Sequence, residues 1–409
     1  MDAYHELMQY NEADYNFFAS LGIGDIEVAQ NRVLFVAKED SHIRNFHLPY
    51  MKWFQEQGWE VHVACNGEPG ISCCDREYLV PFERNPLSWS NRRAIRMMRK
   101  LLRDNQYDIV HCHTPSAAAV TRWAARKLSA ASSMKIIYTA HGFYFHRGGP
   151  WYSWLLYYPV EKYLSRYTDL LITMNEEDYL LAGNKFSHGV TVYIPGVGVD
   201  LRQYSATAVD RQAKRREFGI SDNDFVIISV GELDQRKNHQ QVIKALALME
   251  ERSDIYYLIC GRGEREDSLK KLASDAKVNL ILAGYRSDVP EVLAAADLFI
   301  FPSLREGLPR ALMEAMAAGV PVIASDIRGN NDLIEHGVEG MLFPLGNTAA
   351  LREQISYMRR NPAKAEQMVA AARIKLQRFS LAEVMEQMIA LYRSAMEPER
   401  KISTSEQNL

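Results

Sequence analysis

Short apolar runs alternate with longer, periodically apolar segments along most of the chain. Runs of four to six largely apolar residues indicate strands buried on both faces, because a strand with one wet face alternates apolar and polar side chains. Ten such runs predict strands at 32–37, 61–64, 109–112, 135–138, 170–173, 225–230, 255–260, 278–282, 298–301 and 321–324. Since helical patterns separate these runs, we expect parallel sheets covered by helices on both faces.

The alternation pauses between 193 and 220, where the chain turns polar and charged. A chain of 409 residues also exceeds what one hydrophobic core usually supports. We therefore expect two parallel-sheet domains whose strand ends face each other across a cleft. The predicted division is an N-terminal extension at 1–30, a first domain at 31–197, a linker at 198–222, a second domain at 223–380, a helix at 381–398 that returns to the first domain, and a tail at 399–409.

Composition narrows the class of protein. The net charge of −3 argues against a nucleic-acid binder, so no nucleic-acid partner is expected. Five cysteines without C-x-x-C spacing indicate free thiols in a reducing compartment. No apolar run approaches the ~20 residues that span a bilayer, and the acidic N-terminus does not have the pattern of a signal peptide. We predict a cytoplasmic protein, attached to a membrane at most at its surface.

The most informative segment runs from Phe301 to Glu314. A strand passes through Gly307 into a helix with Pro309 in its first turn, and Gly319 suits the end of that helix. The helix N-terminus offers unpaired N–H groups to a diphosphate. Glu306 and Glu314 are spaced to hold a sugar and a ribose around that diphosphate through their hydroxyls. The alternative is that both are solvated surface acids.

This segment carries a resemblance to a known family. Glu306-x7-Glu314, with Gly307-Leu308-Pro309 inside it, resembles the signature of the family 4 retaining glycosyltransferases, closest to bacterial capsular and exopolysaccharide members. Val230-Gly231-Glu232-Leu233 and Lys237-Asn238-His239 are similar to that family's phosphate-contacting loop. The resemblance runs from Arg32 to about residue 395. It implies the GT-B fold, in which two Rossmann-like parallel-sheet domains face each other across a cleft.

The resemblance also implies roles for residues of the second domain. Lys237 would contact the donor diphosphate, Glu314 the ribose and Glu306 the transferred sugar, with Lys237 and Glu306 counted as catalytic. The further donor-binding residues would be Gly307, Leu308, Pro309, Arg310, Arg286, Val289 and Gly261. One position departs from the pattern, because Glu232 stands where many members carry Arg. Arg236 is a candidate to compensate.

In the first domain, His141 follows the strand at 135–138 and so faces the cleft. It is the third catalytic candidate, because the resemblance implies a histidine that reaches the donor sugar; a structural histidine is the alternative. Acceptor-binding candidates are Arg44, His47, Arg84 and His113. For each arginine, an ordinary surface role is equally open.

Two patterns raise the question of a metal. His111 and His113 share one side of a strand, but two ligands without a third argue against zinc. Asp222-Asn223-Asp224 spells D-x-D but sits at a polar turn, where aspartates are common. We expect no metal and no cofactor besides the nucleotide-sugar substrate.

Two further features suggest a membrane. The helix at 91–103 carries arginines along one stripe, and 151–158 is a run of aromatic and leucine residues. An all-positive face is attracted to anionic lipid, and such aromatic runs are typical of membrane interfaces. Either feature alone is explained by packing on the core, and together they predict peripheral attachment to the anionic inner face of the cell membrane.

The expected activity is retaining transfer of a hexose or N-acetylhexosamine from a nucleotide sugar, with UDP preferred. The expected acceptor is an undecaprenyl-diphosphate-type lipid-linked glycan of capsule or exopolysaccharide assembly. One alternative is a GT-B nucleotide-sugar 2-epimerase, for which the first domain lacks a convincing carboxylate set. The other is a non-catalytic sugar-nucleotide binder, which only Glu232 favours.

Overall fold

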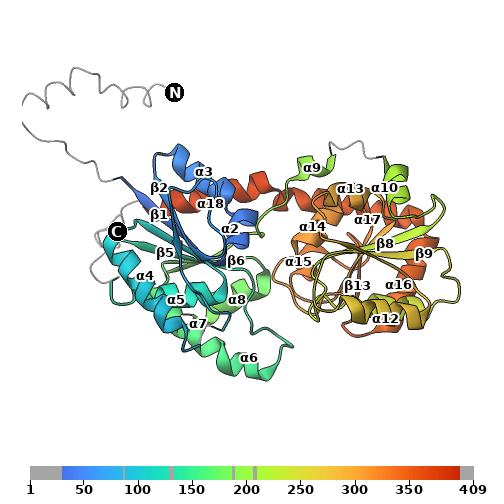
Figure 1. The fold of residues 1–409 in the computed structure, drawn as a ribbon, viewed down its shortest axis with the longest axis horizontal. Helices are drawn as coiled ribbons and strands as arrows, with labels where there is room; N and C mark the ends of the chain where they lie inside the picture. Colours follow the sequence, from blue (N-terminus) through green and yellow to red (C-terminus); the bar gives the residue numbers. More distant parts are fainter. Residues whose placement is uncertain (1–29, 86–87, 129–132, 187–188, 206–209, 397–409) are drawn as a thin grey trace, which may run out of the picture.

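The computed structural model describes residues 30–85, 88–128, 133–186, 189–205 and 210–396. It contains two parallel sheets, one in each half of the chain, with helices on both faces of each (Figure 1). This confirms the predicted α/β fold class. The N-terminal extension, apart from Gln30, and the C-terminal tail lie outside the described residues.

The first sheet has seven strands in the order β3-β2-β1-β4-β5-β6-β7. Their bounds are β1 Arg32–Glu39, β2 Glu60–Asn66, β3 Arg76–Leu79, β4 Ile109–His113, β5 Lys135–Ala140, β6 Leu170–Thr173 and β7 Val190–Tyr193. Both faces are buried because successive side chains point to opposite cores: Val33 and Phe35 join one apolar cluster, Leu34 and Val36 the other.

Helices from distant parts of the chain cover these faces. One face packs against α2 Asp40–Phe46, α3 Leu48–Glu56 and α18 Leu381–Met396, the other against α4 Asn91–Asn105, α5 Pro115–Ala125, α7 Tyr158–Leu164 and α8 Glu176–Lys185 (Figure 1). Two short elements, α6 Trp151–Leu156 and η1 Ser165–Tyr167, flank α7.

The second sheet has six strands in the order β10-β9-β8-β11-β12-β13. Its strands are β8 Phe225–Val230, β9 Ile255–Cys260, β10 Asn279–Gly284, β11 Leu298–Phe301, β12 Val322–Ser325 and β13 Met341–Phe343. The surrounding helices are α11 Gln240–Ala247, α12 Glu266–Ala276, α13 Val289–Ala294, α14 Arg310–Ala317, α15 Asn330–Leu333, α16 Thr348–Arg360, α17 Pro362–Lys375 and η2 Leu376–Phe379. In sequence, the segment between the last strand of the first sheet and the first strand of the second sheet forms α9 Leu201–Ser205 and α10 Arg211–Glu217.

All ten predicted strands are present, but the prediction omitted β3, β7 and β13. Each of these is three or four residues long and lies at the edge of its sheet. Their side chains are largely exposed or half-buried, so their sequences do not form the continuous apolar runs that mark the central strands.

Chain order reverses between β1 and β4 in the first sheet and between β8 and β11 in the second. At such a switch point the loops leave in opposite directions and open a crevice at the carboxyl ends of the strands. The two switch points define where ligands are expected to bind in each domain.

α18 returns the chain to the first sheet. Val384, Met388 and Tyr392 are buried in the same cluster as Phe35 and Phe54. Tyr392 is fully buried, and its hydroxyl lies 2.7 Å from His111 Nδ1. The helix therefore covers a core that the first domain's own helices leave open.

We expect Tyr392→Ala to lower the free energy of unfolding of the first domain by about 3–5 kcal/mol, because it removes a large buried ring and leaves a cavity. All six tryptophans lie between positions 53 and 154, so tryptophan fluorescence during urea unfolding reports this domain. The control variant Tyr152→Ala, at a 51% exposed position, should change the free energy of unfolding by less than about 0.5 kcal/mol. Equal effects would show that α18 does not stabilise the first domain.

Candidate active site

In the second domain, two cations meet one carboxylate at the switch point. Lys237 Nζ lies 2.8 Å and Arg236 Nη1 3.1 Å from the same Glu306 oxygen, Oε1. Lys237 and Arg236 belong to the loop after β8, and Glu306 to the loop after β11. The side chains of Lys237 and Glu306 are only 13% and 11% exposed. Charges this close in a partly desolvated cleft interact more strongly than a surface pair.

Local hydrogen bonds fix the loop that carries Lys237. The backbone N–H of Lys237 donates to Asp234 Oδ1 at 2.8 Å. Asn238 has a left-handed φ of 54°, which asparagine tolerates well, and its amide donates to the Pro302 carbonyl at 3.2 Å. The N–H of Leu304 donates to the carbonyl of Arg236 at 2.8 Å. The loops after β8 and β11 are thereby held as one unit.

His239 also supports this unit through hydrogen bonds. Its ring nitrogens lie 3.1 Å from the Tyr257 hydroxyl and 3.2 Å from the Glu232 carbonyl. Burial lowers the pKa of His239 to about 4, so the ring is neutral near pH 7. It acts as a hydrogen-bonding support, not as a charge.

The helix predicted after Gly307 is α14. Pro309 is its N-cap residue with extended backbone, one position before the predicted first turn, and Gly319 follows its end at φ 75°. Glu314 accepts from Arg310 Nε at 2.9 Å and shares a hydrogen bond with Tyr204. Burial raises the pKa of Glu314, while Arg310 opposes this rise.

The remaining donor-side candidates lie at the ends of β9 and β10. A Cβ on Gly261 would come 1.9 Å from the Gly231 carbonyl, so only glycine permits this approach to the Lys237 loop. Arg286 is paired with Asp288, at 2.5 and 2.7 Å, and with Glu217 at 2.8 Å. Val289 begins α13 directly after this network.

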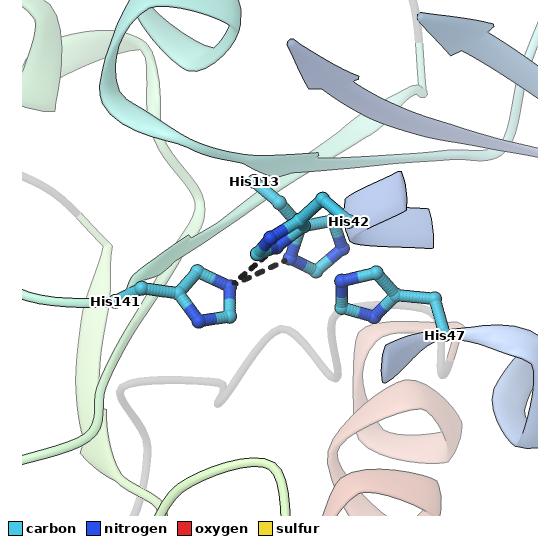
Figure 2. A group of neighbouring side chains, drawn as sticks. All are labelled: His42, His47, His113 and His141. Atoms are coloured by element: carbon cyan, nitrogen blue, oxygen red, sulfur yellow. Dashed lines mark hydrogen bonds between the residues drawn. The ribbon is translucent and has the colours of Figure 1, made fainter. Parts of the chain in front are cut away.

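In the first domain the structure gathers four histidines, His42, His47, His113 and His141, which we call the histidine cluster (Figure 2). His141 Nε2 lies 3.1 Å from His42 Nε2 and 3.5 Å from His113 Nδ1. The ring of His47 stacks on that of His113 with centroids 3.6 Å apart. Three predicted site residues therefore meet at this switch point, together with His42, which the sequence analysis did not select.

The pair of His111 and His113 is not the group that the structure brings together, because His113 lies with three other histidines. His42 and His47 come from α2 and its end, a segment far from β4 in sequence, so strand alternation could not reveal them. His111 itself is not part of the cluster, because its nitrogens are held by Tyr392 at 2.7 Å and Thr139 at 2.8 Å.

The two acceptor-side arginines have different surroundings. Arg44 pairs with Asp40 at 3.0 Å and donates to three backbone carbonyls of the loop at 68–70. Its guanidinium is thus occupied within the first domain. Arg84 instead lines a hollow of about 310 Å³ beside the histidine cluster, together with His42, Phe46 and Tyr144.

The two halves of the site touch through glycines. A Cβ on Gly307 would lie 1.7 Å from the His141 carbonyl, and one on Gly142 would lie 2.9 Å from Gly307 Cα. On the other side, a Cβ on Gly329 would meet the Gly307 carbonyl at 2.2 Å. Backbone lies against backbone here, which places Glu306 beside His141 across the cleft.

A buried ion pair joins the domains next to this contact. Arg328, in the loop after β12, pairs with Asp178 of α8 and also donates to the Phe143 carbonyl. Nearby, the Arg305 guanidinium lies 4.8 Å from the centre of the Tyr144 ring, and Arg310 donates to the Asn45 carbonyl at 3.2 Å. No local sequence pattern indicates these pairs, because their members lie 150 or more positions apart.

Comparison with known families agrees with this architecture. The protein-family model described as Glycosyltransferase Family 4 matches residues 50–179, and the family model described as Glycosyl transferases group 1 matches residues 210–375. The two matches fall on the first and second sheets and include the cluster residues His113 and His141 as well as Lys237, Glu306 and Glu314.

Individual relatives match most of the chain. EpsD of Bacillus subtilis (strain 168), named as a glycosyltransferase, is 38% identical over 90% of this chain and 98% of its own length. The Escherichia coli UDP-Gal:alpha-D-GlcNAc-diphosphoundecaprenol alpha-1,3-galactosyltransferase is 31% identical to this chain. The match covers 66% of this chain and 72% of the relative. The structure of Anabaena HepE with UDP and glucose superposes with a TM-score of 0.74 at 20% identity, covering 89% of this chain and all of HepE.

We expect Gly307→Ala to destabilise the closed arrangement of the domains by about 1–3 kcal/mol, because the added methyl group overlaps the His141 carbonyl. Small-angle X-ray scattering should show a larger radius of gyration for the variant. Gly183→Ala serves as the control, since nothing lies within 4 Å of its added Cβ. An unchanged radius in Gly307→Ala would contradict the proposed dependence of closure on this contact.

Proposed function

The chain belongs to the family 4 glycosyltransferases, and from this premise we propose that it transfers a hexose or N-acetylhexosamine from a nucleotide sugar to a lipid-linked glycan. A UDP-linked donor is supported by the Escherichia coli relative, named for UDP-galactose, and by HepE, solved with UDP and glucose. The name of the Escherichia coli relative also contains a diphosphoundecaprenol acceptor. This name supports an undecaprenyl-diphosphate-type acceptor in capsule or exopolysaccharide assembly.

The observation that carries this proposal is the pair of cations on Glu306. Lys237 and Arg236 share one oxygen of that carboxylate beside the N-terminus of α14. A donor diphosphate is a better partner for two cations and a helix N-terminus than a single carboxylate. Its arrival would release Glu306 to accept hydrogen bonds from the hydroxyls of the transferred sugar.

The neighbouring residues fit the rest of a nucleotide sugar. The partly buried Glu314, one and a half turns into α14, is proposed to bind the ribose hydroxyls. Arg286 and Val289, beyond the end of β10, are proposed to flank a uracil base. Gly307, Leu308, Pro309 and Arg310 form the backbone wall against the diphosphate, and Gly261 keeps the loop with Lys237 close to it.

We propose transfer with retention of the anomeric configuration. The bond from the anomeric carbon to the diphosphate oxygen breaks, and the acceptor hydroxyl oxygen bonds to the same face of that carbon. The hydroxyl proton passes to the departing diphosphate, so no enzyme nucleophile is needed. Lys237 and the α14 N–H groups stabilise the charge that develops on the leaving group. His141 and Glu306 orient the sugar from opposite sides of the cleft.

Glu232 does not preclude this chemistry. Its side chain is 72% exposed and lies 3.6 Å from Arg236, which in turn contacts Glu306. Arg236 is therefore a second cation at Glu306, and we propose that it replaces the arginine usual at position 232 in binding the phosphate.

Exposed aromatic and basic side chains on the first domain support a lipid-linked acceptor. α6 exposes Trp151 (75%), Tyr152, Leu155 (65%) and Leu156, whereas Trp154, Tyr157 and Tyr158 pack on the core. On α4, Arg92, Arg96 and Arg103 are exposed while Met98 and Leu102 are buried. Between α4, α5 and α7 lies a groove of about 560 Å³, lined by Trp89, Ile95, Trp123 and Tyr163 among others. Among the described residues, no helix combines the length and apolar character needed to cross a bilayer.

We propose that α4 and α6 hold the enzyme at the anionic inner face of the cell membrane. Arginine side chains near the headgroups and aromatic side chains at the interface act together. Arg84 and the hollow beside the histidine cluster then lie on the same domain, where they are proposed to receive the acceptor's diphosphate and sugar.

Thermal unfolding with UDP, GDP and ADP and their sugars tests the donor site. The matching nucleotide at a hundredfold excess over its Kd should stabilise the protein by about 2.7 kcal/mol. Glu314→Ala should lose most of this stabilisation, and Glu353→Ala, an exposed acid on α16, should keep it. No stabilisation by any of these nucleotides would overturn the donor-site assignment.

Sedimentation with lipid vesicles tests the membrane surface. Replacing both Arg92 and Arg96 by Gln should weaken binding to phosphatidylglycerol vesicles about 30-fold, because each cation near the surface contributes about 1 kcal/mol of attraction. Binding to phosphatidylcholine vesicles should change little. Lys270→Gln with Lys271→Gln, on α12 of the second domain, is the matched control; an equal loss in both double variants would contradict a specific surface on α4.

A further inference from the structure

The histidine cluster contains more histidine than the proposed transfer uses. His42 lies on α2, His47 follows that helix, His113 ends β4 and His141 follows β5. Each can direct one ring nitrogen to a common point, and these four nitrogens all lie within 4.8 Å of one another (Figure 2). We propose that the histidine cluster is a binding site for a divalent transition-metal ion, with Zn²⁺ as the best-fitting ion.

The spacing of the nitrogens is close to that of a four-coordinate site. Zn–N bonds of 2.0–2.1 Å in a tetrahedron place the ligand nitrogens about 3.3 Å apart. His141 Nε2 is 3.1 Å from His42 Nε2 and 3.5 Å from His113 Nδ1. The widest separation, up to 4.8 Å, requires a contraction of about 1.5 Å.

Buried nitrogens without partners point to a missing ligand. Within the part of the chain that the structure describes, neither ring nitrogen of His47 has a hydrogen-bond partner. His47 is only 3% exposed. Unpaired buried polar atoms are unfavourable and uncommon. The metal would accept one lone pair from each ring and supply a partner that the protein does not.

The chemistry of the ligands favours a metal cation over other occupants. Neutral imidazole offers a lone pair to a metal ion, and the four rings lie together with no acidic side chain in the group. An anion would need protonated rings. The cluster contains no oxygen ligand, which disfavours Mg²⁺ and Ca²⁺. Imidazole suits Zn²⁺, Co²⁺ and Ni²⁺.

Cobalt spectroscopy tests the site without reference to catalysis. The full chain, without an affinity tag, is titrated with Co²⁺; the intense visible absorption of tetrahedral Co²⁺ should appear with one ion per chain. Zn²⁺ should displace the signal, and excess Mg²⁺ should not. His47→Gln and His113→Gln should each weaken Co²⁺ binding at least a hundredfold, more than losing an outer-shell partner does. His146→Gln, a half-buried histidine outside the cluster, should bind as the wild type does.

Folding is checked with a second substitution at the same position. His47→Leu replaces a buried, unpartnered ring by an apolar group and should melt, without metal, at or above the wild-type temperature. It should also show no tetrahedral cobalt spectrum. A wild type without that spectrum, or folded His47 and His113 variants that retain it, would overturn the proposal.

Discussion

Closure of the cleft depends on backbone packing at two glycines. Gly307 and Gly142 let the loop after β11 lie directly against the end of β5, where a single methyl group would overlap the His141 carbonyl. Because protein interiors are close-packed, this contact leaves little freedom in the relative position of the domains. It sets Glu306 beside His141, and the ion pair of Arg328 with Asp178 holds the same arrangement from the flank.

Charge in the closed cleft is balanced internally. Glu306 lies between Lys237 and Arg236, and Glu314 between Arg310 and Tyr204, so neither acid is an uncompensated buried charge. These pairs keep the site polar and preorganised in the absence of a substrate. A diphosphate can exchange with the carboxylate because both offer oxygen acceptors to the same cations.

His141 links the two proposals. It is proposed to face the transferred sugar, and its Nε2 is also one of the nitrogens of the histidine cluster. An ion in the cluster would therefore restrain the same ring that orients the donor sugar. Metal binding and donor-sugar binding are expected to influence each other, whereas binding of the nucleotide in the second domain depends on different residues.

Local sequence was sufficient to determine the fold class, the central strands and the turn from β11 into α14, since apolar runs and glycine and proline positions encode these features within a few residues. It did not reveal the edge strands β3, β7 and β13, whose short, half-exposed sequences carry no such pattern. Only the tertiary structure brought His42 and His47 to His113 and His141, paired Arg236 with Glu306, and occupied Arg44 within its own domain. Such contacts depend on where the ends of distant strands meet, and the periodicity of a single segment does not contain this information.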